Sequence, residues 1–204
     1  MRELVGGVPE QGPCGRAPSL AVPAPLRHGK VRSMKREKHT PALLVVDMQG
    51  FFLDPDSPAF MPSAKAILPR VRALAKAFHR AGRPIAYAVY RTPKTGPMTK
   101  RWHKVCRGQA ALALPATFPA GKRFIKGCYS AFRGTSLLRW LKSRKVKKLV
   151  ICGIKTHLCV ESTVRDAFDL GFEVVVPAKA CASGRPALHR GSLASMAAGF
   201  ARIC

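Results

Sequence analysis

The sequence predicts an α/β protein, a three-layer sandwich in which a six-stranded parallel sheet is flanked by helices. Short apolar runs alternate along the chain with longer segments of helical periodicity. The runs are apolar at consecutive positions, as in strands that are buried on both faces of a sheet. With 204 residues, 47% of them hydrophobic, the chain is long enough for one domain with a substantial core.

The first half of the chain supplies two strands and a helix. ALLVV at 42–46 is a short apolar run that indicates a strand. The segment 63–82 has apolar residues at spacings of three and four, which indicates a helix, and Gly82 closes it. These apolar residues are Ile67, Val71, Leu74 and Phe78. PIAYAVY at 84–90 follows as the second strand.

Further strands follow a Pro- and Gly-rich stretch at 92–121. The segments KRFIK, KLVIC, FEVVV and FARIC are candidate strands at 122–126, 148–152, 172–176 and 200–204. Helices are predicted between them, at 135–145, 157–171 and 187–199. Because successive parallel strands need crossover connections, this alternation predicts a Rossmann-like parallel sheet covered on both faces.

The domain organisation is simple. Residues 1–38 include a Gly- and Pro-rich segment without periodicity and are expected to be a disordered extension, so residues 39–204 form the single folded domain. No secretory signal and no apolar run of about 18 residues is present, so we expect a soluble cytoplasmic protein with no membrane contact. Seven cysteines without a CxxC pair are interpreted as reduced thiols.

The formal net charge is +26. Residues 1–39 hold 8 basic and 3 acidic residues and the rest hold 28 and 7, so +5 and +21 give this total and the folded domain itself is basic. The charges are scattered along helical segments, and no zinc finger or helix-turn-helix pattern accompanies them. We therefore expect no specific nucleic-acid partner, although a basic surface would steer an anionic small-molecule substrate.

Chemically capable residues follow three of the predicted strands. Asp47 comes directly after the first strand, Lys126 ends the third, and the fourth leads through Gly153 to Cys159. The carboxyl ends of parallel strands meet at one edge of a sheet, which is where ligands bind in open α/β folds. These three side chains are therefore expected to converge.

The segments around these residues resemble a known family. VVDMQGFF, KGCYSAFRGTSLLRWL and GIKTHLCVESTVRDAFDLGFEVVV are similar to the three signature blocks of the isochorismatase-like cysteine hydrolases, over residues 40–204. That family includes nicotinamidases and N-carbamoylsarcosine and ureidoacrylate amidohydrolases. The resemblance implies an isochorismatase-like fold and a catalytic triad of Asp47, Lys126 and Cys159. It also implies a cis Ile154–Lys155 peptide and an oxyanion hole formed by the backbone N–H groups of Lys155 and Cys159.

Physical reasoning assigns roles to the triad. Thr156 is a candidate N-cap, which would place Cys159 at the third helical position, where the helix dipole and a nearby lysine favour a thiolate with a pKa below about 8.5. Asp47, held by Lys126, would act as general acid and base. Taken alone, a cysteine after an apolar strand is more often a packing residue, so the assignment depends on the three residues together.

Other expectations concern the pocket. Phe52, Trp102, Tyr129 and Phe132 are candidate pocket residues, with subunit contacts as the alternative, and Arg91 is a candidate partner for a substrate carboxylate. In nicotinamidases, the resemblance implies a metal site made by an Asp and histidines after the second strand. The corresponding residues 90–104 of this chain contain His103 and no Asp. We therefore expect no metal and no cofactor. The resemblance further implies a homo-oligomer.

The sequence thus predicts a metal-independent hydrolase that cleaves the C–N bond of a small amide or carbamoyl compound through a thioacyl-enzyme intermediate. Two alternatives remain. One is the hydrolysis of an isochorismate-like vinyl ether with Asp47 as general acid. The other is a basic binding protein that keeps the fold without turnover.

Overall fold

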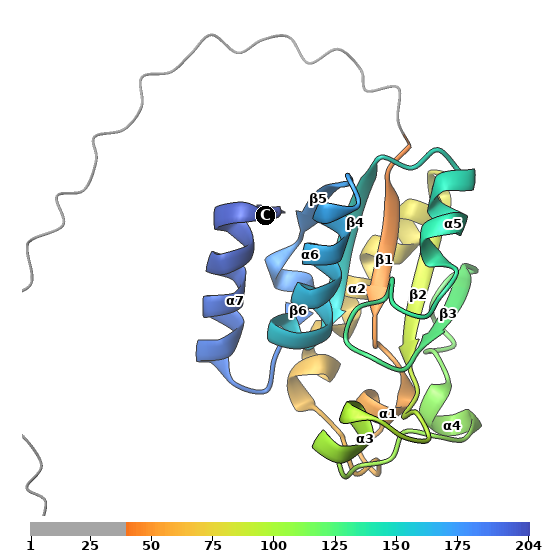
Figure 1. Cartoon of the computed structure of the whole chain (residues 1–204). Coiled ribbons are helices and arrows are strands. Elements are labelled where there is room, and N and C mark those ends of the chain that lie inside the picture. Colours follow the sequence, from red (N-terminus) through yellow and green to blue (C-terminus); the bar gives the residue numbers. More distant parts are fainter. Residues whose placement is uncertain (1–39) are drawn as a thin grey trace, which may run out of the picture. The chain divides into compact units, whose positions relative to one another are not determined.

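The structure is a computed structural model that describes residues 40–204. These residues form a parallel sheet with the strand order β3-β2-β1-β4-β5-β7, and β6 pairs with β4 (Figure 1). The strands are β1 (Ala42–Val46), β2 (Ile85–Tyr90), β3 (Lys122–Lys126), β4 (Lys148–Ile154), β5 (Glu173–Val176), β6 (Cys181–Ala182) and β7 (Arg202–Ile203). The predicted α/β class and parallel sheet are confirmed, whereas the predicted extension at 1–38 lies outside the described residues.

Helices cover both faces of the sheet. The longer ones are α2 (Pro62–Arg80), α5 (Leu137–Ser143), α6 (Glu161–Asp169) and α7 (Pro186–Gly199). The shorter ones are α1 (Gly50–Leu53), α3 (Pro97–Arg101), α4 (Gln109–Leu112), the π-helical turn η1 (Thr156–Val160) and the 3₁₀ turn η2 (Ala178–Ala180). Figure 1 shows α2 behind the sheet and α5 and α6 in front of it. These crossovers bury the sheet, which explains why β1 and β2 are apolar at every position.

The direction of the chain across the sheet reverses at β1. From β1 the chain proceeds to β2 and β3 on one side, and then returns to place β4, β5 and β7 on the other side. Such a reversal opens a crevice beyond the carboxyl ends of the two central strands. Here those strands are β1 and β4, which pair from Ala42 with Leu149 to Val46 with Gly153.

The differences from the predicted elements lie in the shortest ones. The sheet contains β6, a two-residue strand whose Cys181 pairs with Gly153, in addition to the six predicted strands. Two residues are too few to show an alternation or an apolar run, so β6 has no sequence signal. The short helices α1, α3 and α4 span four or five residues and escape the periodicity test for the same reason.

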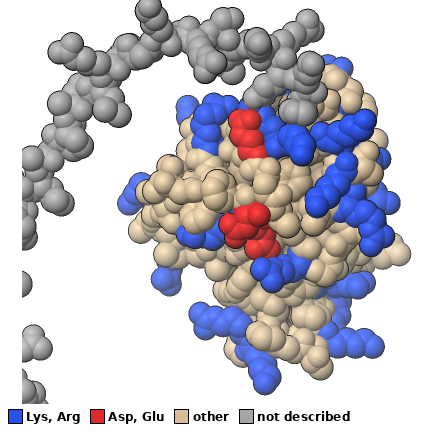
Figure 2. Space-filling model, turned by 45° about the horizontal axis from the view of Figure 1, so that its top comes forward, with Lys and Arg blue, Asp and Glu red and all other residues tan. Residues whose placement is uncertain are grey.

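Residues 40–204 contain 28 basic and 7 acidic residues. On the face drawn in Figure 2, Lys and Arg side chains are scattered among other residues, with few acidic side chains between them. No helix within residues 40–204 has the length and apolar character needed to cross a bilayer.

Gly153 allows the ends of β1 and β4 to approach. Its φ of +119° suits glycine, and a Cβ atom there would collide with the backbone of its partner Val46. A side chain would push apart the two strands that carry Asp47 and the nucleophile turn.

We expect Gly153→Ala to lower the free energy of unfolding by about 3 kcal/mol or more, because the new methyl group meets backbone atoms that have no room to move. Urea denaturation checks this. The matched control is Gly191→Ala in α7, where a Cβ would meet open space and helix propensity should make the change neutral or stabilising by up to about 1 kcal/mol. Equal stability of the two variants would contradict the assigned role of Gly153.

Candidate active site

Three elements bring Asp47, Lys126 and Cys159 together, as the strand ends predict. Asp47 follows β1 in the left-handed region, with a φ of 55°. Lys126 Nζ donates a hydrogen bond to Asp47 Oδ2 at 2.9 Å and lies 3.3 Å from Cys159 Sγ. It also donates to the carbonyl oxygen of Cys128 at 3.0 Å. The three protons of the ammonium therefore have three partners, and this arrangement fixes the side chain.

Lys126 reaches this position from the edge of the sheet. From Arg123 onward β3 alternates, since Phe124 and Lys126 are buried while Arg123 and Ile125 are exposed. Because β2 lies between β3 and β1, only a long side chain can span the gap to Asp47. The Lys126 ammonium also lies 5.5 Å from the centre of the Tyr90 ring.

The charges in this cluster are strongly coupled. Burial raises the pKa of the Asp47 carboxyl, although Lys126 opposes this change. Burial disfavours the charge of Lys126, but the Asp47 carboxylate and Cys159 outweigh it and raise the pKa of Lys126 above its usual value. Asp47 and Lys126 are each only 1% exposed, so solvent screens the pair very little. The 2.9 Å contact between Lys126 Nζ and Asp47 Oδ2 fits an ion pair of carboxylate and ammonium.

The expected thiolate at Cys159 is not present. Burial, followed by the negative charge of Asp47, raises the pKa of the Cys159 thiol to about 12 despite the nearby Lys126. The prediction of a pKa below that of a free thiol is wrong, because it considered the lysine and the helix terminus without the burial of the thiol and the charge of the carboxylate. Asp47 Oδ1 is buried without a hydrogen-bond partner among residues 40–204, so it is free to accept a proton.

The turn that carries Cys159 also differs from the prediction. The N-cap residue is Lys155, and Thr156 is the first residue of the π-helical turn η1, so Thr156 does not cap the helix. Instead, Thr156 Oγ1 lies 2.8 Å from His189 Nδ1 of α7. Ser192 Oγ of α7 donates to the Thr156 carbonyl oxygen at 3.2 Å. The turn is thus held from outside by α7.

The Ile154–Lys155 peptide is cis, as the resemblance implies. Lys155 and Cys159 both line the cavity described next. Their proposed role as backbone donors to an oxyanion stays a prediction.

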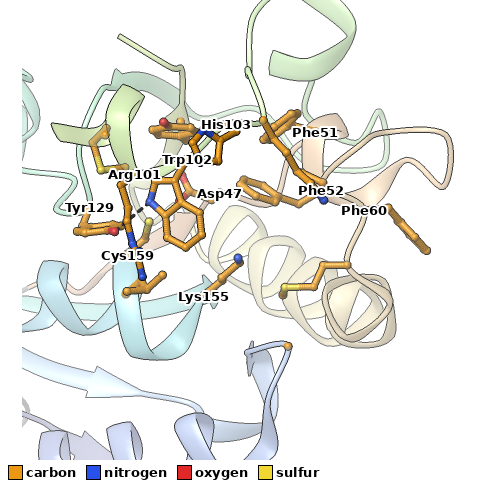
Figure 3. Close-up of a pocket in the computed structure, with 17 residues that line it drawn as sticks. Asp47, Phe51, Phe52, Phe60, Arg101, Trp102, His103, Tyr129, Lys155 and Cys159 are labelled. Atoms are coloured by element: carbon orange, nitrogen blue, oxygen red, sulfur yellow. Dashed lines mark hydrogen bonds between the residues drawn. The ribbon is translucent and has the colours of Figure 1, made fainter. Parts of the chain in front are cut away.

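A cavity of about 630 Å³ opens beside the cluster, large enough for a small organic ligand (Figure 3). Asp47 and Cys159 lie in its wall, together with the predicted Phe52, Trp102 and Tyr129. Trp102 Nε1 donates a hydrogen bond to Tyr129 Oη at 3.0 Å, which joins two of these aromatic side chains.

Two candidate pocket residues do not line this cavity. Arg91 is exposed and follows Tyr90, whose side chain lies in the cavity wall, and neighbouring side chains leave a strand on opposite sides. The Phe132 ring stacks on Phe172 at 6.0 Å and packs against the main hydrophobic core. The sequence locates both residues near strand ends, but it does not give the direction of their side chains.

Gln49 supports the cavity wall, a role that the sequence did not predict. Its Nε2 donates to the carbonyl oxygens of Tyr90 and Ala111, both at 2.9 Å, and its Oε1 accepts from the Tyr90 N–H at 2.7 Å. Gln49 is fully buried and ties the end of β2 to α4. Its place two residues after Asp47 in VVDMQGFF was the available signal, because a glutamine in an apolar segment needs buried partners.

Comparison with known proteins identifies relatives of this chain. The family model for the isochorismatase domain matches residues 41–204. Nicotinamidase 3 of Arabidopsis thaliana is 30% identical over 85% of this chain and 90% of its own length. A probable inactive nicotinamidase of the same plant is 27% identical over 76% of this chain and 87% of its own. The zinc complex of Pyrococcus horikoshii pyrazinamidase superposes with a TM-score of 0.74 at 27% identity, over 81% and 98% of the two chains.

The zinc in that relative raises the question of a metal site here. Within residues 40–204, no three His, Cys, Asp or Glu side chains lie close enough together to hold a metal ion. His103 lines the cavity, and the only acidic side chain in the cavity wall is Asp47, which is paired with Lys126. The described residues therefore do not fit a metal centre of this kind.

We expect Asp47→Asn to lower the pKa of the Cys159 thiol, because it removes the negative charge that opposes the thiolate and leaves Lys126 as its counter-ion. Alkylation of Cys159 by iodoacetamide at neutral pH should become at least about tenfold faster. Peptide mass spectrometry measures this rate, with the exposed Cys204 as internal reference.

Asp166→Asn is the matched control for this experiment, because Asp166 pairs with Arg133 and does not line the cavity. It should leave the alkylation of Cys159 unchanged. Slower alkylation in Asp47→Asn would show that the carboxylate does not hold the thiol in its protonated form.

Proposed function

The chain belongs to the isochorismatase family, and from this we propose that it is a metal-independent cysteine hydrolase that cleaves the C–N bond of a small amide or carbamoyl compound. Its relatives include hydrolases of amides, which supports the hydrolase class. The observation that carries the proposal is the contact of one buried ammonium, Lys126 Nζ, with both the Asp47 carboxylate and the Cys159 sulfur.

In the acylation step, Cys159 Sγ attacks the carbonyl carbon of the substrate while its proton passes to Asp47. The carbonyl oxygen becomes an oxyanion, to which the backbone N–H groups of Lys155 and Cys159 would donate. Asp47 then gives the proton to the leaving nitrogen, the C–N bond breaks, and a thioester to Cys159 remains. A thiol with a pKa of about 12 needs such an adjacent base at neutral pH.

In the deacylation step, Asp47 takes a proton from a water molecule that attacks the thioester carbon. The second oxyanion collapses, the C–S bond breaks, and the Cys159 sulfur recovers the proton as the acid product leaves. Lys126 stays protonated throughout, holds Asp47 in place and compensates the negative charge that moves between carboxylate and sulfur.

Two other functions from the sequence remain to be tested. Hydrolysis of an isochorismate-like vinyl ether would use Asp47 as an acid and would not need a sulfur nucleophile. The second alternative is a basic binding protein that keeps the fold without turnover. The similarity to a probable inactive nicotinamidase gives this alternative a specific basis. We also propose that the protein is cytoplasmic and forms a homo-oligomer.

Cys159→Ala should lower amide turnover by about 10³-fold or more, because it removes the sulfur that forms the proposed thioester. Ammonia release from a panel of amides measures this, and denaturing mass spectrometry of the wild type should show an acyl adduct on the Cys159 peptide. Cys128→Ala is the matched control, since only the carbonyl group of Cys128 contacts Lys126. Retained vinyl-ether hydrolysis in Cys159→Ala would favour the acid-catalysed alternative, and absence of any turnover in the wild type would favour a binding protein.

The pH dependence of kcat/KM should show an acid limb only. Asp47 must be ionised to accept the thiol proton, so activity falls as the pH drops through its pKa, which burial raises above that of an ordinary carboxyl. The pKa of Cys159 is about 12, and that of Lys126 lies above its usual value. We therefore expect a plateau up to about pH 10 with an uncharged amide. An alkaline decline centred near pH 8 would contradict this protonation state.

A further inference from the structure

The cavity contains cations without acidic partners. Among residues 40–204, three basic side chains lie in its wall, namely Arg101, Lys104 and Lys155. The one carboxylate that these residues place in the wall, Asp47, is paired with Lys126. Arg101 and Lys104 are exposed, whereas Lys155 is half-buried. Lys155 has therefore lost part of its hydration without gaining an ion pair among residues 40–204.

The ammonium of Lys155 is held inside the cavity by an aromatic ring. It lies 5.0 Å from the centre of the Trp102 ring, and the guanidinium of Arg101 lies 5.6 Å from the centre of the same ring. The hydrogen bond from Trp102 Nε1 to Tyr129 fixes that ring. Figure 3 shows Trp102, Tyr129 and Cys159 at one end of the cavity, with Lys155 below them. A cation–π contact offsets only about 0.5–2 kcal/mol of the lost hydration, so this group of cations favours an anion.

The electrostatics of Lys155 agree with this geometry. Burial lowers its pKa, and the charge of Lys104 adds to this effect, while the Cys159 sulfur opposes it. A bound carboxylate would reverse the change, because an opposite charge within about 4–6 Å favours the ammonium form.

The other end of the cavity carries aromatic side chains. Phe51, Phe52 and Phe60 lie there, away from Lys155 and Arg101 (Figure 3). A ligand that fits both ends has a hydrocarbon or aromatic body with an acid group near Lys155. Arg91, which the sequence suggested as the partner of a substrate carboxylate, lies outside this wall.

We propose that the substrate carries a carboxylate that does not react, and that Lys155 binds it between Trp102 and the nucleophile turn, with Arg101 beside it. This inference rests on the proposed function, because it assigns the specificity of the same site. The side chain of Lys155 is then a specificity determinant, which is distinct from the backbone N–H of the same residue.

The test is a binding experiment that needs no turnover. In the Cys159→Ala background, isothermal titration calorimetry compares 3-carbamoylbenzoate with benzamide, which lacks the carboxylate. The acid should bind at least about tenfold more tightly than benzamide, as expected for a charge-assisted contact in a partly desolvated site. Lys155→Met should remove this preference, whereas Lys155→Arg should keep most of it. The matched control is Lys142→Met, an exposed lysine of α5 outside the cavity wall, which should change nothing.

The outcomes separate this inference from the proposed function. A preference for the acid that Lys155→Met abolishes supports the inference, even if no amide is hydrolysed by the wild type. Equal binding of the two probes, or a preference that persists in Lys155→Met, overturns it, even if amides are hydrolysed. With the active protein, the ratio of kcat/KM for the two amides should fall in Lys155→Met by the same factor as the ratio of affinities.

Discussion

The buried ion pair between Lys126 and Asp47 is the constraint on which the rest of the site depends. Two charges that are almost without solvent contact would cost several kcal/mol each to bury if they were not paired and hydrogen-bonded. The pair therefore requires Asp47, which follows β1, and Lys126, which ends β3, to lie at similar levels on either side of β2. The parallel register provides this, because Val46 pairs with Ala88 and Lys126 pairs with Tyr90. Gln49 serves the same requirement, because its amide satisfies the backbone of Tyr90 between these two strands.

This pair also determines where the proton of the nucleophile resides. A lysine beside a cysteine usually favours the thiolate, but here the ammonium is already paired with the Asp47 carboxylate, whose negative charge opposes the thiolate. The result is a cluster with zero net charge that contains a thiol, an ammonium and a base. Moving the proton from Cys159 to Asp47 keeps that net charge, so the attack on a carbonyl does not create an uncompensated charge in a buried site.

The strands and the convergence of Asp47, Lys126 and Cys159 could be predicted from the sequence, because both follow from patterns along single segments. ALLVV and KRFIK match β1 and β3 in full, and Asp47 and Lys126 follow from where these runs end. The protonation of Cys159 could not be predicted in this way, because it depends first on the burial of the thiol and then on the charges of Asp47 and Lys126, which come from other strands. Thr156 has the residue type of an N-cap, yet its hydroxyl contacts His189 of α7, a tertiary contact without local signal. The cavity wall draws on the Pro- and Gly-rich segment after β2, where neither helical nor strand periodicity gives the direction of side chains such as Arg91 and Trp102.

The large positive charge of the chain does not by itself show which charges bind a ligand. Most Lys and Arg side chains on the face in Figure 2 are scattered over the surface, where water and salt screen them. Lys155 differs from them in its location, because it is half-buried, lies 5.0 Å from the centre of the Trp102 ring and faces a cavity that also exposes Cys159. Desolvation makes a charge selective, since an ammonium that has lost water gains more from a carboxylate than an exposed one does. The net charge of +26 can bring anions to the protein, whereas the location of Lys155 can distinguish one small acid from another.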